Sequence, residues 1–317
     1  MKLSILHDTI YTYTTAVESA QHVAHLKPID VSTQTVASHV LTIDPAPPAV
    51  QTHTDAFGNT MSHWALNQAH HHLHVRACSQ VQTLVLPLPE AESTTASWDS
   101  VREQFRYHAG QDTDLNSRFV FASHHAPVDE AFAHYARSVF TPERPLVDAA
   151  TALMQRIHAD FTYASQSTDI HTPALQALQE RRGVCQDFAH ILIACLRSLG
   201  LPACYVSGYL LTQPPEGQKR LVGSDASHAW AAVYVPDTKT HASGGWLHLD
   251  PTNNRWGWGS PGEDYVHVAS GRDFADVSPL RGILQGGASH SLQVGVTVEP
   301  LEQTDHEEST NERLQET

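Results

Sequence analysis

Residues 181–202 have the sequence RRGVCQDFAHILIACLRSLGLP, and this stretch decides the fold class. From Phe188 to Leu199 nearly every residue is apolar, so a helix here would be apolar around almost its whole circumference. A helix of that kind is stable only in the centre of a domain, with other elements packed around it. Gly200 suits a C-terminal cap and Pro202 prevents the helix from continuing. The stretch therefore predicts a buried helix that begins near Cys185.

The segments around this helix predict an α+β domain. Upstream, apolar residues at helical spacing predict an amphipathic helix over 145–160, and Pro173 opens a second helix over 173–181. Downstream, strands are predicted at 203–211, 228–235 and 245–250, the last two joined as a hairpin. Helices followed by an antiparallel sheet are an α+β arrangement, here a buried helix packed on an antiparallel sheet.

The first 85 residues have a different texture. Leu3, Ile5, Tyr11 and Tyr13 fall at even spacings, as on one face of an extended segment. Turn-forming residues separate further strand candidates at 34–43, 60–66 and 71–85. We therefore predict an N-terminal antiparallel β domain over 1–88. A linker with a short helix follows over 89–127, then the α+β domain over 128–301 and an acidic, disordered tail over 302–317.

Composition and charge indicate which binding partners and which cellular compartment to expect. The formal net charge is −15, which repels nucleic acid and anionic membranes. The chain does not start with a basic segment followed by an apolar run, and no later stretch approaches the ~20 apolar residues of a spanning helix. We therefore expect a cytoplasmic protein with no membrane or nucleic-acid partner. Its four cysteines include no CxxC pair, so neither a disulfide framework nor a structural zinc site is indicated.

Three residues in the α+β domain suit thiol catalysis. Cys185 lies where a loop becomes a helix, and the positive end of a helix favours a thiolate. His228 begins one predicted strand and Asp250 ends another, so an antiparallel hairpin would make them neighbours. A nucleophile, a base and a group that orients the base are what thiol catalysis requires. The alternative is structural, because a cysteine at a helix start is more often a small buried side chain.

Other residues are candidates for supporting roles. The backbone N–H of Cys185 would supply one oxyanion-hole donor, and Gln179 or Gln186 are candidates for the second. Tryptophans near the predicted site either wall the substrate cleft or belong to the core, namely Trp230, Trp246, Trp256 and Trp258. We assign no role to His248. A thiol–imidazole–carboxylate triad needs neither a metal nor an organic cofactor, so we expect none.

Two patterns suggest metal sites and have plainer explanations. Alternation along a strand would place His70, His72 and His74 on one face, where three imidazoles could bind Zn²⁺ or Ni²⁺. The alternative is a solvated strand face. A set of acidic residues could bind a cation, or could pack a loop through local hydrogen bonds. This set is Asp264, Asp273 and Asp276.

Four segments resemble the bacterial transglutaminase-like superfamily, whose members are often described as cysteine proteases. GVCQDFAH at 183–190 is similar to its nucleophile motif, ASHAW at 226–230 to its histidine motif and LDPTN at 249–253 to its aspartate motif. The late segment GRDFADVSPLRG at 271–282 also resembles the family, and the first ~85 residues resemble its N-terminal β domain. The resemblance implies a papain-like core with Cys185, His228 and Asp250 as the triad.

We predict an amide hydrolase, because water is abundant and the sequence shows no acceptor site, and two alternatives stay open beside it. The hydrolase would cleave a peptide, isopeptide or small amide through a thioester acyl-enzyme. The first alternative is transamidation by the same triad, with an amine in place of water, which requires that water be excluded from the cleft. The second alternative is a non-catalytic binding module, for which loss of triad residues would be expected.

Overall fold

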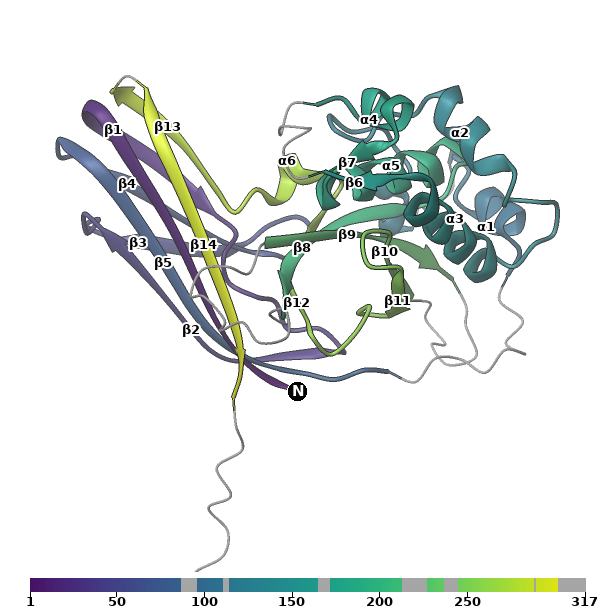
Figure 1. Cartoon of the computed structure of the whole chain (residues 1–317), viewed down its shortest axis with the longest axis horizontal. Helices are drawn as coiled ribbons and strands as arrows, with labels where there is room; N and C mark the ends of the chain where they lie inside the picture. The colour runs from purple at the N-terminus through teal and green to yellow at the C-terminus, as the bar shows by residue number, and fades with distance from the viewer. Residues whose placement is uncertain are drawn as a thin grey trace, which may run out of the picture.

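The computed structural model describes residues 1–86, 96–110, 114–164, 172–212, 227–236, 245–287 and 289–301. In this part of the chain a seven-stranded antiparallel sheet, a five-stranded antiparallel sheet and a set of helices form the α+β fold that the sequence predicts (Figure 1). The five-stranded sheet lies between the helices and the seven-stranded sheet. The predicted tail and part of the predicted linker lie outside the described residues.

The central helix α5 (Cys185–Ser198) begins at the predicted residue, and every residue from Asp187 to Arg197 is buried. Gly200 follows it with a φ of +81°, in the left-handed region that glycine adopts without strain, and its N–H donates to the carbonyl of Arg197. One face of the five-stranded sheet and the helices α2, α3 and α4 surround α5. An all-round apolar helix is thus covered on every side.

The five-stranded sheet has the order β11-β10-β9-β8-β12, and every neighbouring pair is antiparallel. Three of its strands confirm predictions, and β11 and β12 were not anticipated. The strands are β8 (Ala203–Leu210), β9 (Ser227–Val235), β10 (Gly245–Asp250), β11 (Arg255–Trp258) and β12 (Tyr265–Gly271).

Two of the helices start as their prolines predict, because Pro145 and Pro173 directly precede α3 and α4. Helix α2 was not predicted as a separate element, although Asp129 caps its start by accepting from the N–H of Ala131. The other helices and the two short strands β6 and β7 complete this part of the chain. The bounds are α1 (Trp98–Gln104), the 3₁₀ helix η1 (Leu115–Phe119), α2 (Glu130–Arg137), α3 (Leu146–Asp160), β6 (Thr162–Tyr163), α4 (Ala174–Glu180), β7 (Arg182–Gly183) and α6 (Phe274–Val277). Among the described residues, no helix has the length and apolar character needed to cross a membrane.

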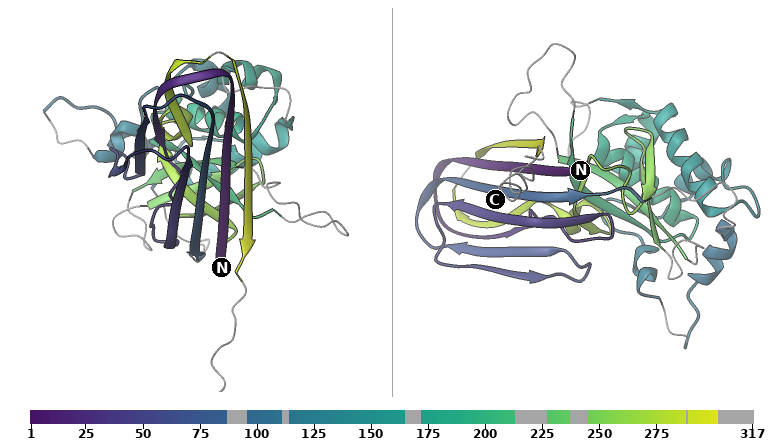
Figure 2. Two further views of the ribbon diagram at one scale, coloured as in Figure 1. Left: turned by 90° about the vertical axis from the view of Figure 1, so that its left-hand side faces the viewer. Right: turned by 90° about the horizontal axis from the view of Figure 1, so that it is seen from below.

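The seven-stranded sheet is organised around one long strand, β1. Its first half pairs with β5 on one side and β14 on the other, and its second half pairs with β4 and β13. The pairing is irregular between Thr12 and Val17, where the two halves meet. Figure 2 shows the long strands in front of the helical part. The strands are β1 (Lys2–Ala24), β2 (Gln34–Asp44), β3 (Val50–Thr54), β4 (Thr60–Leu66), β5 (His70–Thr83), β13 (Leu280–Gly286) and β14 (His290–Pro300).

The predicted domain boundary at the C-terminal end is wrong. Strands β13 and β14 fall within the predicted α+β domain over 128–301, yet they pair with β1 at the opposite end of the chain. The physical reason is that β1 would otherwise expose one edge of unpaired N–H and C=O groups along its whole length. We therefore use "β domain" for residues 1–86 together with 280–301, and "α+β domain" for the described residues between 96 and 279.

The two domains share one hydrophobic core. Leu3 and Ile5 of β1 and Val298 of β14 belong to the same buried cluster as the apolar residues of α5. A buried polar contact lies in this interface, where Nδ1 of His7 and the hydroxyl of Tyr209 on β8 are 2.8 Å apart. The β domain is therefore not an independent unit attached by a linker.

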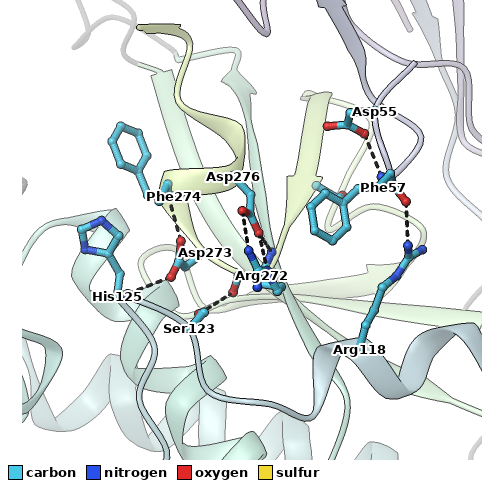
Figure 3. Close-up of polar contacts among 12 residues, drawn as sticks. Asp55, Phe57, Arg118, Ser123, His125, Arg272, Asp273, Phe274 and Asp276 are labelled. Atoms are coloured by element: carbon cyan, nitrogen blue, oxygen red, sulfur yellow. Dashed lines mark hydrogen bonds and ion pairs between the residues drawn. The ribbon is translucent and has the colours of Figure 1, made fainter. Parts of the chain in front are cut away.

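Two side-chain amides fix how the domains are joined. Gln34 accepts from the N–H of His267 on β12 and donates to its carbonyl, both at 2.8 Å. Asn59 makes the same pair of 2.8 Å bonds with the backbone of Ser270. Arg118 of η1 also donates to the carbonyl of Ala56, in the same β-domain turn as Asn59 (Figure 3). Each amide thus satisfies two backbone groups of β12, buried at His267 and partly buried at Ser270, that no neighbouring strand pairs at these positions.

Replacing Asn59 by alanine should destabilise the whole protein. Asn59 is fully buried, and its loss leaves the N–H and carbonyl of Ser270 without these partners. Unsatisfied buried groups cost about 1–3 kcal/mol each, so Asn59→Ala should lower the free energy of unfolding by roughly 2–3 kcal/mol in urea titrations. Asn67→Ala, at an exposed turn, is the matched control and should change it by less than about 0.5 kcal/mol. Equal effects of the two substitutions would contradict this account of the interface.

Candidate active site

Cys185 is the first residue of α5 and is half-buried, so reagents can reach its thiol. The turn before it is held by Asp187, whose carboxylate accepts from the N–H of Val184 at 2.8 Å. Gly183 makes this close approach possible, since a Cβ at that position would lie 2.6 Å from a carboxylate oxygen of Asp187. The local sequence thus places a thiol at the N-terminus of a buried helix.

His228 and Asp250 are neighbours, as the predicted hairpin requires. The Nε2 of His228, at the start of β9, donates to Oδ2 of Asp250, at the end of β10, over 2.7 Å. His228 is 9% exposed and Asp250 is fully buried. Because Asp250 occupies Nε2, the ring nitrogen left for Cys185 is Nδ1.

Asp250 is held by several donors besides His228. Its Oδ2 also accepts from the Tyr265 hydroxyl at 2.7 Å and from the side-chain amide of Asn253 at 2.8 Å, and its Oδ1 accepts from the N–H of Thr252 at 2.9 Å. Burial by itself raises the pKa of Asp250, but the hydrogen bonds from His228, Tyr265 and Asn253 outweigh it and lower the pKa below its usual value. The carboxylate is therefore charged and fixed in orientation at neutral pH.

The electrostatics of His228 favour the imidazolium. Burial lowers its pKa, yet the hydrogen bonds and negative charges of Asp250 and Cys185 outweigh burial and raise the pKa to about 10. Because Cys185 contributes to this shift, its thiol lies beside the imidazole. The fold therefore brings the three predicted triad residues together.

Trp230 and His248 form the layer behind His228. The Trp230 ring stacks on His228 with centroids 6.0 Å apart, and its indole N–H donates to Nδ1 of His248 over 2.8 Å. Trp230 is buried, so it supports the imidazole and does not line an open cleft. His248, for which the sequence suggests no role, accepts this bond and orients Trp230.

Several predicted supporting residues lie elsewhere. Gln179 is exposed on α4 and lines a groove among α2, α3 and α4, which corrects its placement beside the thiol. The buried residues of its helix are instead Ala174, Ala177 and Leu178. Gln186 is half-buried directly after Cys185, and it stays a candidate oxyanion-hole donor with the backbone N–H of Cys185.

The tryptophans also divide into different environments. Trp246 packs edge-on against Phe119 at 5.2 Å, at the far end of β10 from Asp250, so its predicted place in the cleft wall is wrong. Three residues of extended strand, Leu247 to Leu249, separate the two positions. Trp256 is half-buried on β11 opposite Leu249 and stays a candidate for the cleft wall.

The histidine run does not form a metal site. His70 is buried against Tyr13, whereas His72 and His74 are hydrogen-bonded to Asp44 and Asp8. The three acidic candidates have protein partners, since Asp264 pairs with Arg255. Asp276 pairs with Arg272, and Asp273 caps α6 (Figure 3). The part of the chain that the structure describes contains no group of three or more His, Cys, Asp or Glu side chains arranged to hold a metal ion.

Sequence reasoning missed two residues of the site, Tyr265 and Asn253. Asn253 lies in the LDPTN segment, three positions after Asp250, so proximity in sequence could have indicated it. Tyr265 comes from β12, which pairs with β8 on the far side of β9, and no spacing rule points to it.

Comparison with known proteins identifies the family. The family model of the transglutaminase-like superfamily matches residues 133–251, and that of the bacterial transglutaminase-like N-terminal region matches residues 3–82. An uncharacterized protein of Mycobacterium tuberculosis is 40% identical over 303 residues, covering 94% of this chain and 92% of its own length. The chain belongs to the transglutaminase-like superfamily.

This transglutaminase-like protein is also similar to a named enzyme and to a protein of known structure. A protein-glutamine gamma-glutamyltransferase of Pseudomonas aeruginosa is 31% identical over 138 residues, which cover 41% of this chain and 19% of that protein. The crystal structure of a "putative cysteine protease" from Cytophaga hutchinsonii superposes with a TM-score of 0.70 at 20% identity, covering 95% of this chain and 91% of the other. The second comparison shows that both domains of the transglutaminase-like protein occur together in another solved fold.

The four thiols of this transglutaminase-like protein should alkylate at distinct rates. Cys195 and Cys204 are buried, and burial raises the pKa of Cys195 and brings that of Cys204 to about 12, so both should react slowest. Cys78 is exposed, so the reagent reaches its thiol directly and it serves as the reference for accessibility. Cys185, beside an imidazolium, should react with iodoacetamide about tenfold faster than Cys78, measured by peptide mass spectrometry. Equal rates for Cys78 and Cys185 in the folded protein would argue against an activated thiol.

The charge on His228 should persist to high pH. With its pKa raised from 6.5 to about 10, the stability that the imidazolium contributes is fully present below about pH 6.5 and is lost as the pH rises through about 10. NMR of ¹³C-labelled histidines should show the His228 imidazolium at pH 8, and Asp250→Asn should lower its pKa. Asp148→Asn, which removes an exposed carboxylate on α3, should leave it unchanged. Titration of His228 near pH 6.5 in the unmodified protein would contradict the ion-paired site.

Proposed function

We propose that this protein cleaves amide bonds through a thioester acyl-enzyme formed on Cys185. The single observation that supports this function is the buried 2.7 Å hydrogen bond between His228 and Asp250, next to the reachable thiol of Cys185 at the start of α5. Membership of the transglutaminase-like superfamily agrees with it. Substrates of the proposed class are peptides, isopeptides and small amides.

In the first half-reaction, the thiolate of Cys185 attacks the amide carbonyl carbon and forms a tetrahedral oxyanion. The imidazolium of His228 then gives its Nδ1 proton to the leaving nitrogen, the C–N bond breaks and the amine departs. Asp250 holds the ring through Nε2 while its charge changes. The backbone N–H of Cys185 is the proposed first donor to the oxyanion, and the side chain of Gln186 the second.

In the second half-reaction, the acyl group leaves Cys185. Water loses a proton to neutral His228 and attacks the thioester carbonyl, which releases a carboxylic acid and the free thiol. An amine attacking in the same way gives a new amide instead. The relative named as a protein-glutamine gamma-glutamyltransferase supports this transamidation as the second candidate function.

Mass spectrometry with an amide library distinguishes the two candidates. The protein is incubated with glutamine-containing peptides, lysine isopeptides and small amides, each with and without a primary amine such as cadaverine. Hydrolysis yields a carboxylic acid together with a released amine or ammonia, whether or not cadaverine is present, and the masses of the two products add up to that of the substrate plus one water. Transamidation instead yields a cadaverine adduct of the acyl group, with release of the original amine or ammonia. Absence of any acyl-enzyme and any product across the library would count against both candidates.

Substitutions in the triad should differ in severity. Cys185→Ala should abolish turnover, and His228→Ala should be nearly as severe, because the thiol loses its base and the leaving amine loses its acid. Asp250→Asn should be milder, since an amide oxygen can still accept from Nε2. The asparagine would turn its NH₂ toward the N–H of Thr252, so we expect a loss of stability as well.

Steady-state kinetics on the best library substrate measures these effects, with circular dichroism as the check on folding. Cys78→Ala removes an exposed thiol and should retain normal turnover. A double substitution of Cys185 and His228 should cost little more than Cys185→Ala, because triad members act as a unit. Near-normal turnover of His228→Ala would assign the base to another residue.

A further inference from the structure

A cavity of about 420 Å³ lies between the two domains, on the face of the five-stranded sheet away from α5. The β domain contributes Ile29, Val31 and Phe57 to its lining, and the α+β domain contributes residues of η1, β8, β10, β11 and β12. Neither Cys185, His228 nor Asp250 lines it. The cavity is therefore separate from the triad, although His248 belongs both to its lining and to the layer behind His228.

The walls of this cavity are aromatic. Phe57 and Phe119 have ring centroids 5.7 Å apart, and Phe119 meets Trp246 edge-on at 5.2 Å. Trp258 completes the lining on the β11 side. Such walls favour a flat, apolar ligand over a flexible polar one.

Two imidazoles provide convergent polar groups within the lining. His248 is 4% exposed and its Nδ1 accepts from Trp230, so its ring proton is on Nε2, which is left as a donor. His267 is 9% exposed; its Nε2 contacts the Ser270 hydroxyl at 2.7 Å, and its Nδ1 has no hydrogen-bond partner. Burial lowers the pKa of both residues, to about 4 for His267, so both rings are neutral. Buried polar groups of this kind are normally paired, and a ligand atom would supply the missing partner.

The charge of the lining is positive, although the whole chain carries a formal net charge of −15. Arg118 is the one ionised side chain among the described residues that line the cavity, and they include no carboxylate. Its guanidinium lies 5.2 Å from the ring centroids of both Phe57 and Phe119, and one arm donates to the carbonyl of Ala56 at 2.6 Å (Figure 3). Its Nε is buried without a hydrogen-bond partner. This lining favours an anion.

We propose that the cavity between the domains binds a small planar aromatic carboxylate. One or two rings would lie among Phe57, Phe119 and Trp246, and the carboxylate would accept from Arg118. A volume of about 420 Å³ is within the ~300–1,000 Å³ range of small-molecule sites. Because the lining comes from both domains, the ligand would bind the folded protein and hold the domains together.

The test is a titration of the full chain with benzoate, indole-3-carboxylate and 2-naphthoate, followed by calorimetry and tryptophan fluorescence. Saturable binding is expected for at least one of the three, together with a rise in the midpoint of thermal unfolding. The neutral amide of the best ligand should bind about tenfold more weakly, as expected for loss of a charged hydrogen bond. Failure of all three carboxylates to saturate, or equal affinity for the amide, would overturn the proposal.

Substitutions at Arg118 test whether the carboxylate binds in this cavity. Arg118→Gln should weaken the carboxylate about tenfold, and Arg118→Lys should weaken it less because the charge is kept. Arg144→Gln is the matched control, since Arg144 also donates to a backbone carbonyl, that of Val139, away from the cavity. In NMR of ¹³C-labelled histidines, the ligand should shift the imidazoles of His248 and His267. Equal weakening by Arg118→Gln and Arg144→Gln, or binding without these shifts, would place the ligand elsewhere and refute the site.

Discussion

The burial of α5 is the constraint on which the rest of this structure depends. A helix that is apolar on every side must be enclosed, and one sheet face together with α2, α3 and α4 encloses it. Its N-terminus approaches the surface, because Val184, Cys185 and Gln186 are only half-buried there. The packing around α5 that stabilises the domain therefore leaves the Cys185 thiol accessible at the start of this buried helix.

The polar residues of the site depend on one another for their hydrogen bonds. Asp250 is fully buried, and a buried carboxylate is tolerated only when hydrogen bonds replace its hydration. Tyr265, Asn253 and the backbone of Thr252 supply those bonds, so the charge is kept and fixes the His228 ring. Trp230 and His248 close the other side of the imidazole. Burial lowers the pKa of His228, but its negative partners Asp250 and Cys185 raise it by more, so the net shift is upward.

The β domain is part of the same folding unit. The shared core around Leu3, Ile5 and Val298 contributes apolar contacts, while Gln34 and Asn59 satisfy backbone groups of β12. Strand β12 also carries Tyr265, so the β domain supports the strand that holds Asp250 from behind. The proposed ligand cavity exists only where the two domains face each other.

The sequence by itself determined the local features. The α5 boundaries, the starts of α3 and α4 at prolines, and the strands β8 to β10 follow from periodicity and turn chemistry, which act over a few residues. The neighbouring positions of His228 and Asp250 follow from hairpin geometry, and the family motifs point to the same residues. Only the tertiary structure decided the rest. Pairing of β14 with β1 and of Arg118 with Ala56 joins residues far apart in sequence. Tyr265 reaches Asp250 from β12, which lies beyond β9 and β8 in the sheet. Local sequence patterns carry no information about such partners. The partners depend on which buried polar groups still lack a hydrogen bond once the elements have packed.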